Sequence, residues 1–178
     1  NAGVSFRTAE GEIEIEKAEK TFKVNLFGLI YCVSELLNNQ LLKKNSIIAG
    51  VSSMADRRGF PKSGFYCASK AAASIYLESL RNELFFKGIK VITIKPGFVK
   101  TPMTDKNEFK MPLIIETDKA AKIIIRGIKN EKRIIRFPSI LSLLTRIMGI
   151  IPSFIFDNFS RIHLKSINAS SKILQEKK

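Results

Sequence analysis

The sequence has very few of the residues on which most metal and nucleophile chemistry depends. Its 178 residues include one histidine, His163, two cysteines and no tryptophan. A single histidine gives little support to a histidine-based zinc site, a Ser-His-Asp triad or a Cys-His dyad. Cys32 and Cys67 lie far apart without metal-ligand spacing, which is typical of buried thiols in a reducing compartment such as the cytoplasm. We therefore predict no metal site and a chemistry that uses other groups.

Long uninterrupted apolar runs are also missing. The first residues, "NAGVSF", have neither the basic start nor the apolar stretch of a secretory signal. Residues 138–160 are strongly apolar, but Arg146 and Pro152 interrupt them, which argues against a membrane-spanning helix. The length and the 45% of hydrophobic residues are sufficient for one ordinary globular domain with a core.

Acidic residues are scarce in the C-terminal third of the chain. From Lys119 to the end there are 13 Lys and Arg but 3 Asp and Glu, and the net charge of the whole chain is +14. Such a basic segment can meet anionic lipid or nucleic acid, although a solvated basic face explains it equally well. We expect no nucleic-acid partner, because no recognition motif accompanies the charge.

Hydrophobic periodicity predicts an alternation of helices and strands. The predicted helices cover 17–44, 65–87 and a segment capped by Thr117 or Asp118, and the predicted strands cover 46–52, 89–95 and 133–137. Gly88 is placed to end the second helix in a left-handed conformation. The first two strands are short, apolar and rich in branched residues, as in strands buried on both faces. Strand, helix and strand in this order favour a parallel crossover, whose ligands bind beyond the carboxyl ends of the strands.

The stretch "GFYCASKAAAS", residues 64–74, places Tyr66 four residues before Lys70 on a predicted helix. Residues four apart share one helix face, so the Lys70 ammonium can stabilise the Tyr66 phenolate and lower the pKa of the tyrosine. A Tyr-x-x-x-Lys pair alone is weak evidence in a lysine-rich chain. Its surroundings must decide whether the pair is functional.

Four further features stand in a fixed order around this pair. The chain opens with "NAG", Asn25 lies in "KVNLFG", Ser53 ends a strand thirteen residues before Tyr66, and "KPGFVKTPM" follows the next strand. In order and spacing they resemble the short-chain dehydrogenase/reductase family from Asn1 to about Lys129. The resemblance implies an α/β, doubly wound (Rossmann-like) parallel sheet that is incomplete at the N-terminus. The glycine-rich phosphate loop of the family is absent, and roughly 80 residues of the expected domain are missing.

The resemblance assigns a role to each residue of the pattern. Tyr66 would be the acid/base that exchanges a proton with a carbonyl oxygen, and Ser53 would hold that oxygen by a hydrogen bond. Lys70 would also bind the nicotinamide ribose, and Asn25 would anchor a proton-relaying water. Glycine at position 97 would let the backbone approach the nicotinamide ring. The residues that would contact the cofactor are Asn1, Ala2, Gly3, Tyr66, Lys70, Pro96, Gly97, Val99 and Thr101.

The function implied by the resemblance is NAD(P)-dependent interconversion of a carbonyl and an alcohol. Family habit alone favours NADP slightly over NAD. The segment after Thr101 would form an apolar substrate lid, which suits a small hydrophobic, lipid-like substrate, although these residues could equally pack the lid itself. They are Met103, Phe109, Met111, Pro112, Leu113, Ile114 and Ile115. A homo-oligomer is compatible with the family.

We expect two parts in the chain. Residues 1–137 would be the C-terminal two-thirds of the catalytic domain, and residues 138–178 a basic, apolar extension. Segment 140–159 and its flanking cations suit a membrane interface, a dimer surface or an extra core helix. The expected localisation is the cytoplasm, with peripheral contact to a membrane. The competing interpretation is a truncated, catalytically inactive remnant of the family or a basic membrane-associated module.

Overall fold

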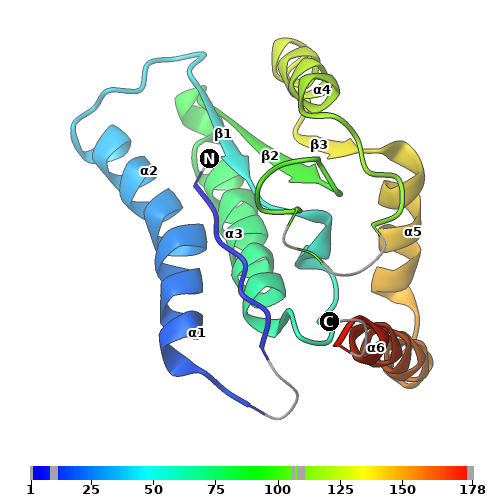
Figure 1. Ribbon diagram of the computed structural model, residues 1–178. Coiled ribbons are helices and arrows are strands. Elements are labelled where there is room, and N and C mark those ends of the chain that lie inside the picture. Colours follow the sequence, from blue (N-terminus) through cyan, green and yellow to red (C-terminus); the bar gives the residue numbers. More distant parts are fainter. Residues whose placement is uncertain (1, 9–11, 106, 108–110, 176–178) are drawn as a thin grey trace.

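A parallel sheet of three strands forms the centre of the computed structural model, which describes residues 2–8, 12–105, 107 and 111–175 (Figure 1). The strands are β1 (Ile47–Val51), β2 (Lys90–Pro96) and β3 (Ile134–Phe137), in the order β1-β2-β3. Ile47 stands opposite Lys90, and Thr93 opposite Ile134. The three predicted strands and their parallel pairing are confirmed, so their carboxyl ends meet at one edge of the sheet.

Helices cover both faces of this sheet (Figure 1). They are α1 (Ile15–Phe22), α2 (Gly28–Asn38), α3 (Gly64–Glu83), α4 (Thr117–Lys129), α5 (Ser139–Ile150) and α6 (Ser153–Gln175). Helix α3 connects β1 to β2 and, with α1 and α2, covers one face, whereas α4 covers the other. Gly88 follows α3 with a φ of 67°, the left-handed conformation that the sequence predicts.

The sheet separates two hydrophobic cores. Val91 packs with Leu77 and Val33 on the α3 side, while Ile92 packs with Ala120 and Ile135 on the α4 side. Neighbouring residues of a strand point to opposite faces, which is why β2 contributes Val91 to one core and Ile92 to the other. This double burial is what its run of branched residues predicts.

Two details of the predicted helices are wrong. The helix expected over 17–44 is interrupted by a π-helical turn at Lys23–Phe27 and ends at Asn38. One extra residue in a turn leaves the spacing of apolar residues almost unchanged, so periodicity does not reveal it. The residue before α4 is Glu116, and the hydroxyl of Thr117 donates to the Lys100 carbonyl (2.6 Å) instead of capping the helix.

The C-terminal helices pack on the loop that follows β1. The Arg58 side chain donates to the carbonyl of Met148 (2.8 Å) and to that of Ile151, and its guanidinium lies 5.0 Å from the centre of the Phe156 ring. Phe60 meets the same ring edge-on at 6.0 Å. Helix α5 ends before Pro152 and α6 begins after it, as the predicted interruption requires. Arg58 therefore ties the extension to the carboxyl edge of the sheet.

Candidate active site

The predicted catalytic residues meet at the carboxyl edge of the sheet. Ser53 follows β1, and Tyr66 and Lys70 lie on the first turns of α3, which starts at this edge. The Lys70 ammonium lies 5.8 Å from the centre of the Tyr66 ring and donates to the Val51 carbonyl (3.2 Å). A Cβ atom added to Gly3 would lie 3.7 Å from the same ammonium and 3.8 Å from the Met103 side chain. The N-terminal segment thus lies beside both Lys70 and the segment after β2.

The predicted lowering of the Tyr66 pKa is wrong for this arrangement. Burial raises the pKa of the Tyr66 hydroxyl, and its interaction with the Ser53 side chain offsets this only in part. Burial also lowers the pKa of Lys70 to about 8. The Lys70 ammonium donates to the Val51 carbonyl. The removal of water from the Tyr66 hydroxyl therefore raises its pKa more than the attraction between the ammonium and a phenolate lowers it. Tyr66 is therefore a protonated hydroxyl at neutral pH, the form that can donate a proton.

Ser53 is held in a geometry that leaves its hydroxyl proton available. The residue is extended, with φ −159° and ψ 160°, and precedes a single 3₁₀ turn, Met54–Asp56. Its Oγ accepts a hydrogen bond from the Ala55 N–H (3.1 Å). Because a serine hydroxyl both accepts and donates, the proton on Oγ can still be given to Tyr66 or to an oxygen of a substrate.

Asn25 uses its side chain to join two segments. Its Oδ1 accepts from the Val4 N–H (2.8 Å), and its Nδ2 donates to the Val4 carbonyl (2.9 Å) and to Ser69 Oγ (3.0 Å). Ser69 Oγ in turn donates to the Tyr66 carbonyl (2.8 Å). These contacts of the Asn25 amide fix the N-terminal segment against α3. The water contact that the resemblance implies for Asn25 stays a prediction.

Gly97 lies where the end of β2 meets β3 and α5. The residue follows β2, and its N–H donates to the Phe137 carbonyl (2.8 Å). A Cβ atom at this position would lie 2.6 Å from Leu141 of α5 and 3.3 Å from Pro138. A side chain at position 97 would therefore crowd Leu141 and Pro138. The access to a nicotinamide ring that the resemblance implies for Gly97 stays a prediction. Pro96 is the last residue of β2.

Thr104 organises the remaining predicted cofactor residues after β2. Its hydroxyl donates to the Val99 carbonyl (2.8 Å) and accepts from the Thr101 N–H (2.9 Å). Val99 also pairs with Ile115 in an isolated parallel bridge. The sequence analysis missed Thr104, although a second threonine three residues after Thr101 was a usable signal. Ala2 is exposed and Gly3 half-buried, whereas Asn1 and the predicted lid residue Phe109 lie outside the described residues.

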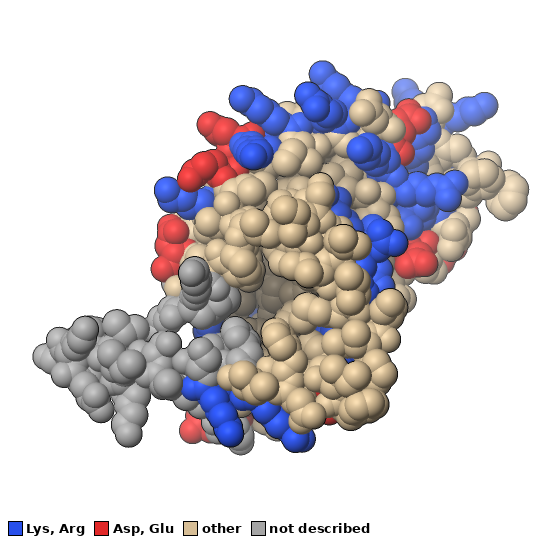
Figure 2. All heavy atoms as spheres, turned by 90° about the vertical axis from the view of Figure 1, so that its right-hand side faces the viewer, with Lys and Arg blue, Asp and Glu red and all other residues tan. Residues whose placement is uncertain are grey.

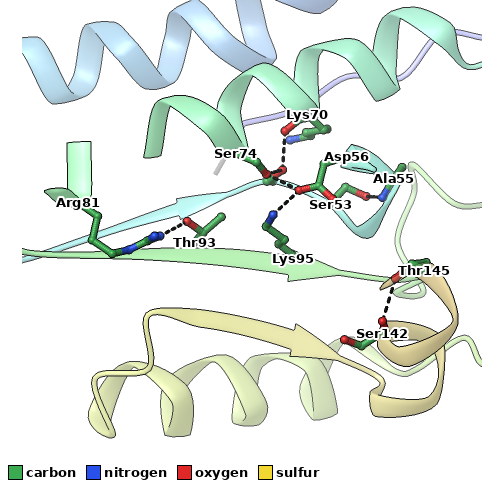
Figure 3. Close-up of polar contacts among 11 residues, drawn as sticks. Ser53, Ala55, Asp56, Lys70, Ser74, Arg81, Thr93, Lys95, Ser142 and Thr145 are labelled. Atoms are coloured by element: carbon green, nitrogen blue, oxygen red, sulfur yellow. Dashed lines mark hydrogen bonds and ion pairs between the residues drawn. The ribbon is translucent and has the colours of Figure 1, made fainter. Parts of the chain in front are cut away.

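A buried polar network behind Lys70 was also missed (Figure 3). Ser52 Oγ donates to the Lys70 carbonyl (2.8 Å) and lies 2.8 Å from Ser74 Oγ, which donates to Asp56 (2.5 Å). Asp56 forms an ion pair with Lys95 of β2, and the two side chains are 3% and 11% exposed. The position of Ser74 four residues after Lys70 was the available signal. The network ties α3 to β1 and β2 directly behind the catalytic pair.

No helix in the part of the chain that the structure describes is long and apolar enough to cross a bilayer.

Comparisons with known proteins agree with this geometry. The family model described as short chain dehydrogenase matches residues 1–111. An uncharacterized oxidoreductase from Myxococcus xanthus (strain DK1622) is 35% identical over 161 residues, which are 90% of this chain. Human 17-beta-hydroxysteroid dehydrogenase 13 is 28% identical over 173 residues, 94% of this chain. The chain spans 64% and 58% of the lengths of these two relatives.

A solved structure shows the same fold. It is a short chain dehydrogenase from Burkholderia cenocepacia J2315 in complex with NADP, with a TM-score of 0.66 and 23% identity. The match covers 82% of this chain and 62% of that one. The parallel sheet, its flanking helices and this partial coverage agree with the incomplete doubly wound fold that the resemblance implies.

Proposed function

The chain belongs to the short-chain dehydrogenase family, and from this premise we propose that its protein is an NAD(P)-dependent oxidoreductase that interconverts a carbonyl and an alcohol. The observation that carries the proposal is the placement of Tyr66, Ser53 and Lys70 together at the carboxyl edge of the sheet, by the end of β1 and the start of α3. Ligands of parallel sheets bind at this edge.

The residues of this edge fit the nicotinamide end of such a cofactor. Among the described residues, none accepts a hydrogen bond from the Val99 N–H, so this group is free to bind a carboxamide oxygen. The Lys70 ammonium, next to Gly3, would bind ribose hydroxyls. When bound, the cofactor supplies or takes up the hydride. We propose NADP ahead of NAD, in line with the NADP of the Burkholderia relative.

Two hydroxyl groups of this chain would serve the carbonyl oxygen during reduction. Tyr66, which burial keeps protonated, gives its proton to that oxygen as negative charge develops there. Ser53, whose Oγ proton is still available, donates a hydrogen bond to the same oxygen and stabilises the developing charge. Lys70 then stabilises the phenolate that remains. In the oxidation direction the same groups act in reverse.

We propose a hydrophobic, lipid-like carbonyl or alcohol as the substrate. Met103 lies near Gly3 and Lys70, and Leu113 and Ile114 of the same segment are 43% and 42% exposed. Apolar side chains around a few polar groups are the usual lining of sites for apolar ligands. The name of the human relative, a hydroxysteroid dehydrogenase, supports an apolar substrate as well.

The Tyr66→Phe variant, made in the protein at its full native length, tests the proposed mechanism. We expect a loss of turnover of about 10²–10⁴-fold, because general acid catalysis is removed, with little change in cofactor affinity. Tyr76→Phe is the matched control, since Tyr76 is a half-buried tyrosine on the same helix, and it should keep its activity. Undiminished turnover of Tyr66→Phe would refute the assignment. Absence of cofactor binding in the unmodified protein would favour the inactive remnant instead.

We further propose that α5 and α6 form a peripheral contact with a membrane that holds the substrate. Among the residues whose burial the structure describes, the two helices expose nine large apolar side chains, namely Ile140, Leu143, Leu144, Ile147, Ile150, Phe154, Ile155, Phe159 and Ile162. On α5 they recur at three- and four-residue intervals and so share one face. Flotation with liposomes should be lost in the double variant Phe154→Asp/Ile155→Asp. Equal flotation of both proteins would remove this proposal.

A further inference from the structure

A groove of about 450 Å³ lies between α4, β3 and α5, away from Tyr66 and Lys70. The groove is lined by five cationic side chains, which are Lys119, Lys122, Arg126, Lys132 and Arg136. No carboxylate is among its described lining residues. Ser142 adds a hydroxyl group from α5. A cavity with five positive charges and a hydroxyl is built for a negatively charged ligand.

The sequence of α4 concentrates these charges on one side. Lys119, Lys122 and Arg126 follow each other at intervals of three and four residues, so they share a helix face. Lys132 and Arg136 come from the turn after α4 and from β3. Figure 2 shows Lys and Arg side chains gathered over the upper part of this face of the molecule, where α4 lies.

None of these five cations forms an ion pair with a described carboxylate. The ion pairs found among the described residues join Lys17 to Glu14, Lys90 to Glu131, Lys95 to Asp56 and Lys100 to Glu116, and they include none of the five cations. Burial and the nearby charges of Arg57 and Arg146 lower the pKa of the Arg136 guanidinium, and the Asp56 carboxylate offsets this only in part. Mutual repulsion of this kind is relieved by a bound anion.

The side chains in the groove suit phosphate groups. A guanidinium binds two oxygens of one phosphate, and an ammonium acts as a compact point charge. Side chains three or four residues apart on a helix start about 5–6 Å from one another, so the row on α4 can contact more than one phosphate. Phosphate chemistry is therefore a better match than a single carboxylate.

The neighbouring apolar surface indicates where these phosphates come from. Helix α5, which contributes Ser142 to the groove, exposes Ile140, Leu143 and Ile147 to 63%, 58% and 47%. In Figure 2 uncharged residues cover the part of the face below the cations, where α5 and α6 lie. Cations beside an exposed apolar helix face are the arrangement that binds anionic bilayers. We propose that the groove binds the phosphate headgroups of anionic phospholipids.

Vesicle binding by the protein at its full native length tests the groove. With vesicles of phosphatidylcholine and phosphatidylglycerol in a 7:3 ratio, the variant Lys119→Gln/Lys122→Gln/Arg126→Gln should bind about 100-fold more weakly, since each cation near an anionic surface contributes roughly a factor of five. The matched control Lys23→Gln/Lys43→Gln/Lys87→Gln removes the same charge from exposed positions outside the groove. It should bind nearly as well as the unmodified protein. Circular dichroism melting curves check that both variants fold.

The outcomes separate this site from the functions proposed above. An equal loss of vesicle binding in the two triple variants would overturn the proposed headgroup site, because net charge alone would then explain the binding. Binding to pure phosphatidylcholine vesicles that equals binding to the anionic vesicles would overturn it as well and leave only the apolar contact. Saturable binding of pyrophosphate without vesicle binding would show that the groove takes a soluble phosphate ligand. This result would overturn the proposal that the phosphates belong to phospholipid headgroups. Turnover of a water-soluble carbonyl should be unchanged in the groove variant, whichever way vesicle binding falls.

Discussion

The region behind Lys70 buries polar side chains, whereas the region of α4 to α6 exposes apolar ones. Behind Lys70 the polar side chains of Ser52, Ser74 and Asp56 are buried and hydrogen-bonded. In α5 and α6 large apolar side chains are exposed, up to 80% at Ile150. A buried polar group is tolerated only with partners inside the protein, whereas an extensive exposed apolar face indicates a partner outside it. In the first region the polar groups find partners inside the protein, apart from Asp56 Oδ1, which accepts no hydrogen bond from the described residues. The second region is built for contact.

The largest expected effect comes from breaking the buried ion pair. Asp56→Ala leaves Lys95 as a cation without its partner in a site where its side chain is 11% exposed. We expect the free energy of unfolding to fall by about 3–5 kcal/mol, as when one member of a buried pair is removed. Urea denaturation measures it. Asp157→Ala in α6, which removes an exposed carboxylate, should stay within about 0.5 kcal/mol, and similar losses in both variants would contradict the comparison.

A pair of apolar truncations sharpens the same contrast. Leu77→Ala in α3 removes a fully buried side chain and should lower the free energy of unfolding by about 2–5 kcal/mol. Ile150→Ala in α5 removes an exposed one and should change it by less than about 0.5 kcal/mol. Thermal unfolding, followed by circular dichroism, compares the two. A large loss for Ile150→Ala would mean that the α5 face is covered within the protein.

Local patterns predicted the elements and the proximity of Tyr66 and Lys70. The three strands follow from short apolar runs, and α3 follows from apolar spacing that ends at Gly88. Tyr66 and Lys70 lie on one helix, so a spacing of four residues fixes their proximity. The position of Ser53 at the carboxyl edge of the sheet follows from the end of β1 just before it, which the sequence marks clearly. All of these inferences concern residues that are close in the chain or in one regular element.

What the sequence did not predict depends on contacts between distant segments. A side chain at position 97 would crowd Leu141, and the partner of Asp56 is Lys95 on β2. The direction of the Tyr66 pKa depends on how completely the fold removes water from its hydroxyl. The spacing of the apolar residues in α5 likewise cannot show whether they face the core or the solvent. A buried and an exposed apolar helix face have the same period in the sequence.

Lys70 provides a smaller effect that depends on pH. Burial lowers its pKa from an ordinary value of 10.5 to about 8. Between these values the unfolded chain holds a proton that the folded chain has released, so stability rises with pH in this window. Relative to Lys70→Met, the unfolding free energy of the unmodified protein should increase by about 1 kcal/mol from pH 7 to pH 9.

Measurements for this comparison should stop at pH 9. Tyr66 and Cys67, whose pKa values are raised by burial, contribute in the opposite direction at higher pH. Lys43→Met removes an exposed lysine and should show no such difference from the unmodified protein between pH 7 and pH 9. A difference that stays constant for Lys70→Met would show that Lys70 titrates in the folded protein as it does in the unfolded chain.

The smallest effect is expected for an ion pair at the surface. Lys90 Nζ lies 2.5 Å from Glu131 Oε1, and the two side chains are 37% and 52% exposed. Water and salt screen such a pair, so Glu131→Gln should lower the free energy of unfolding by about 0.2–1 kcal/mol. The loss should shrink further in 1 M NaCl, where the Debye length is about 3 Å, whereas the loss for Asp56→Ala should persist because its site excludes the solvent. A salt-independent loss for Glu131→Gln would mean that shape or hydrogen bonding, rather than charge, stabilises the contact between the start of β2 and the turn after α4.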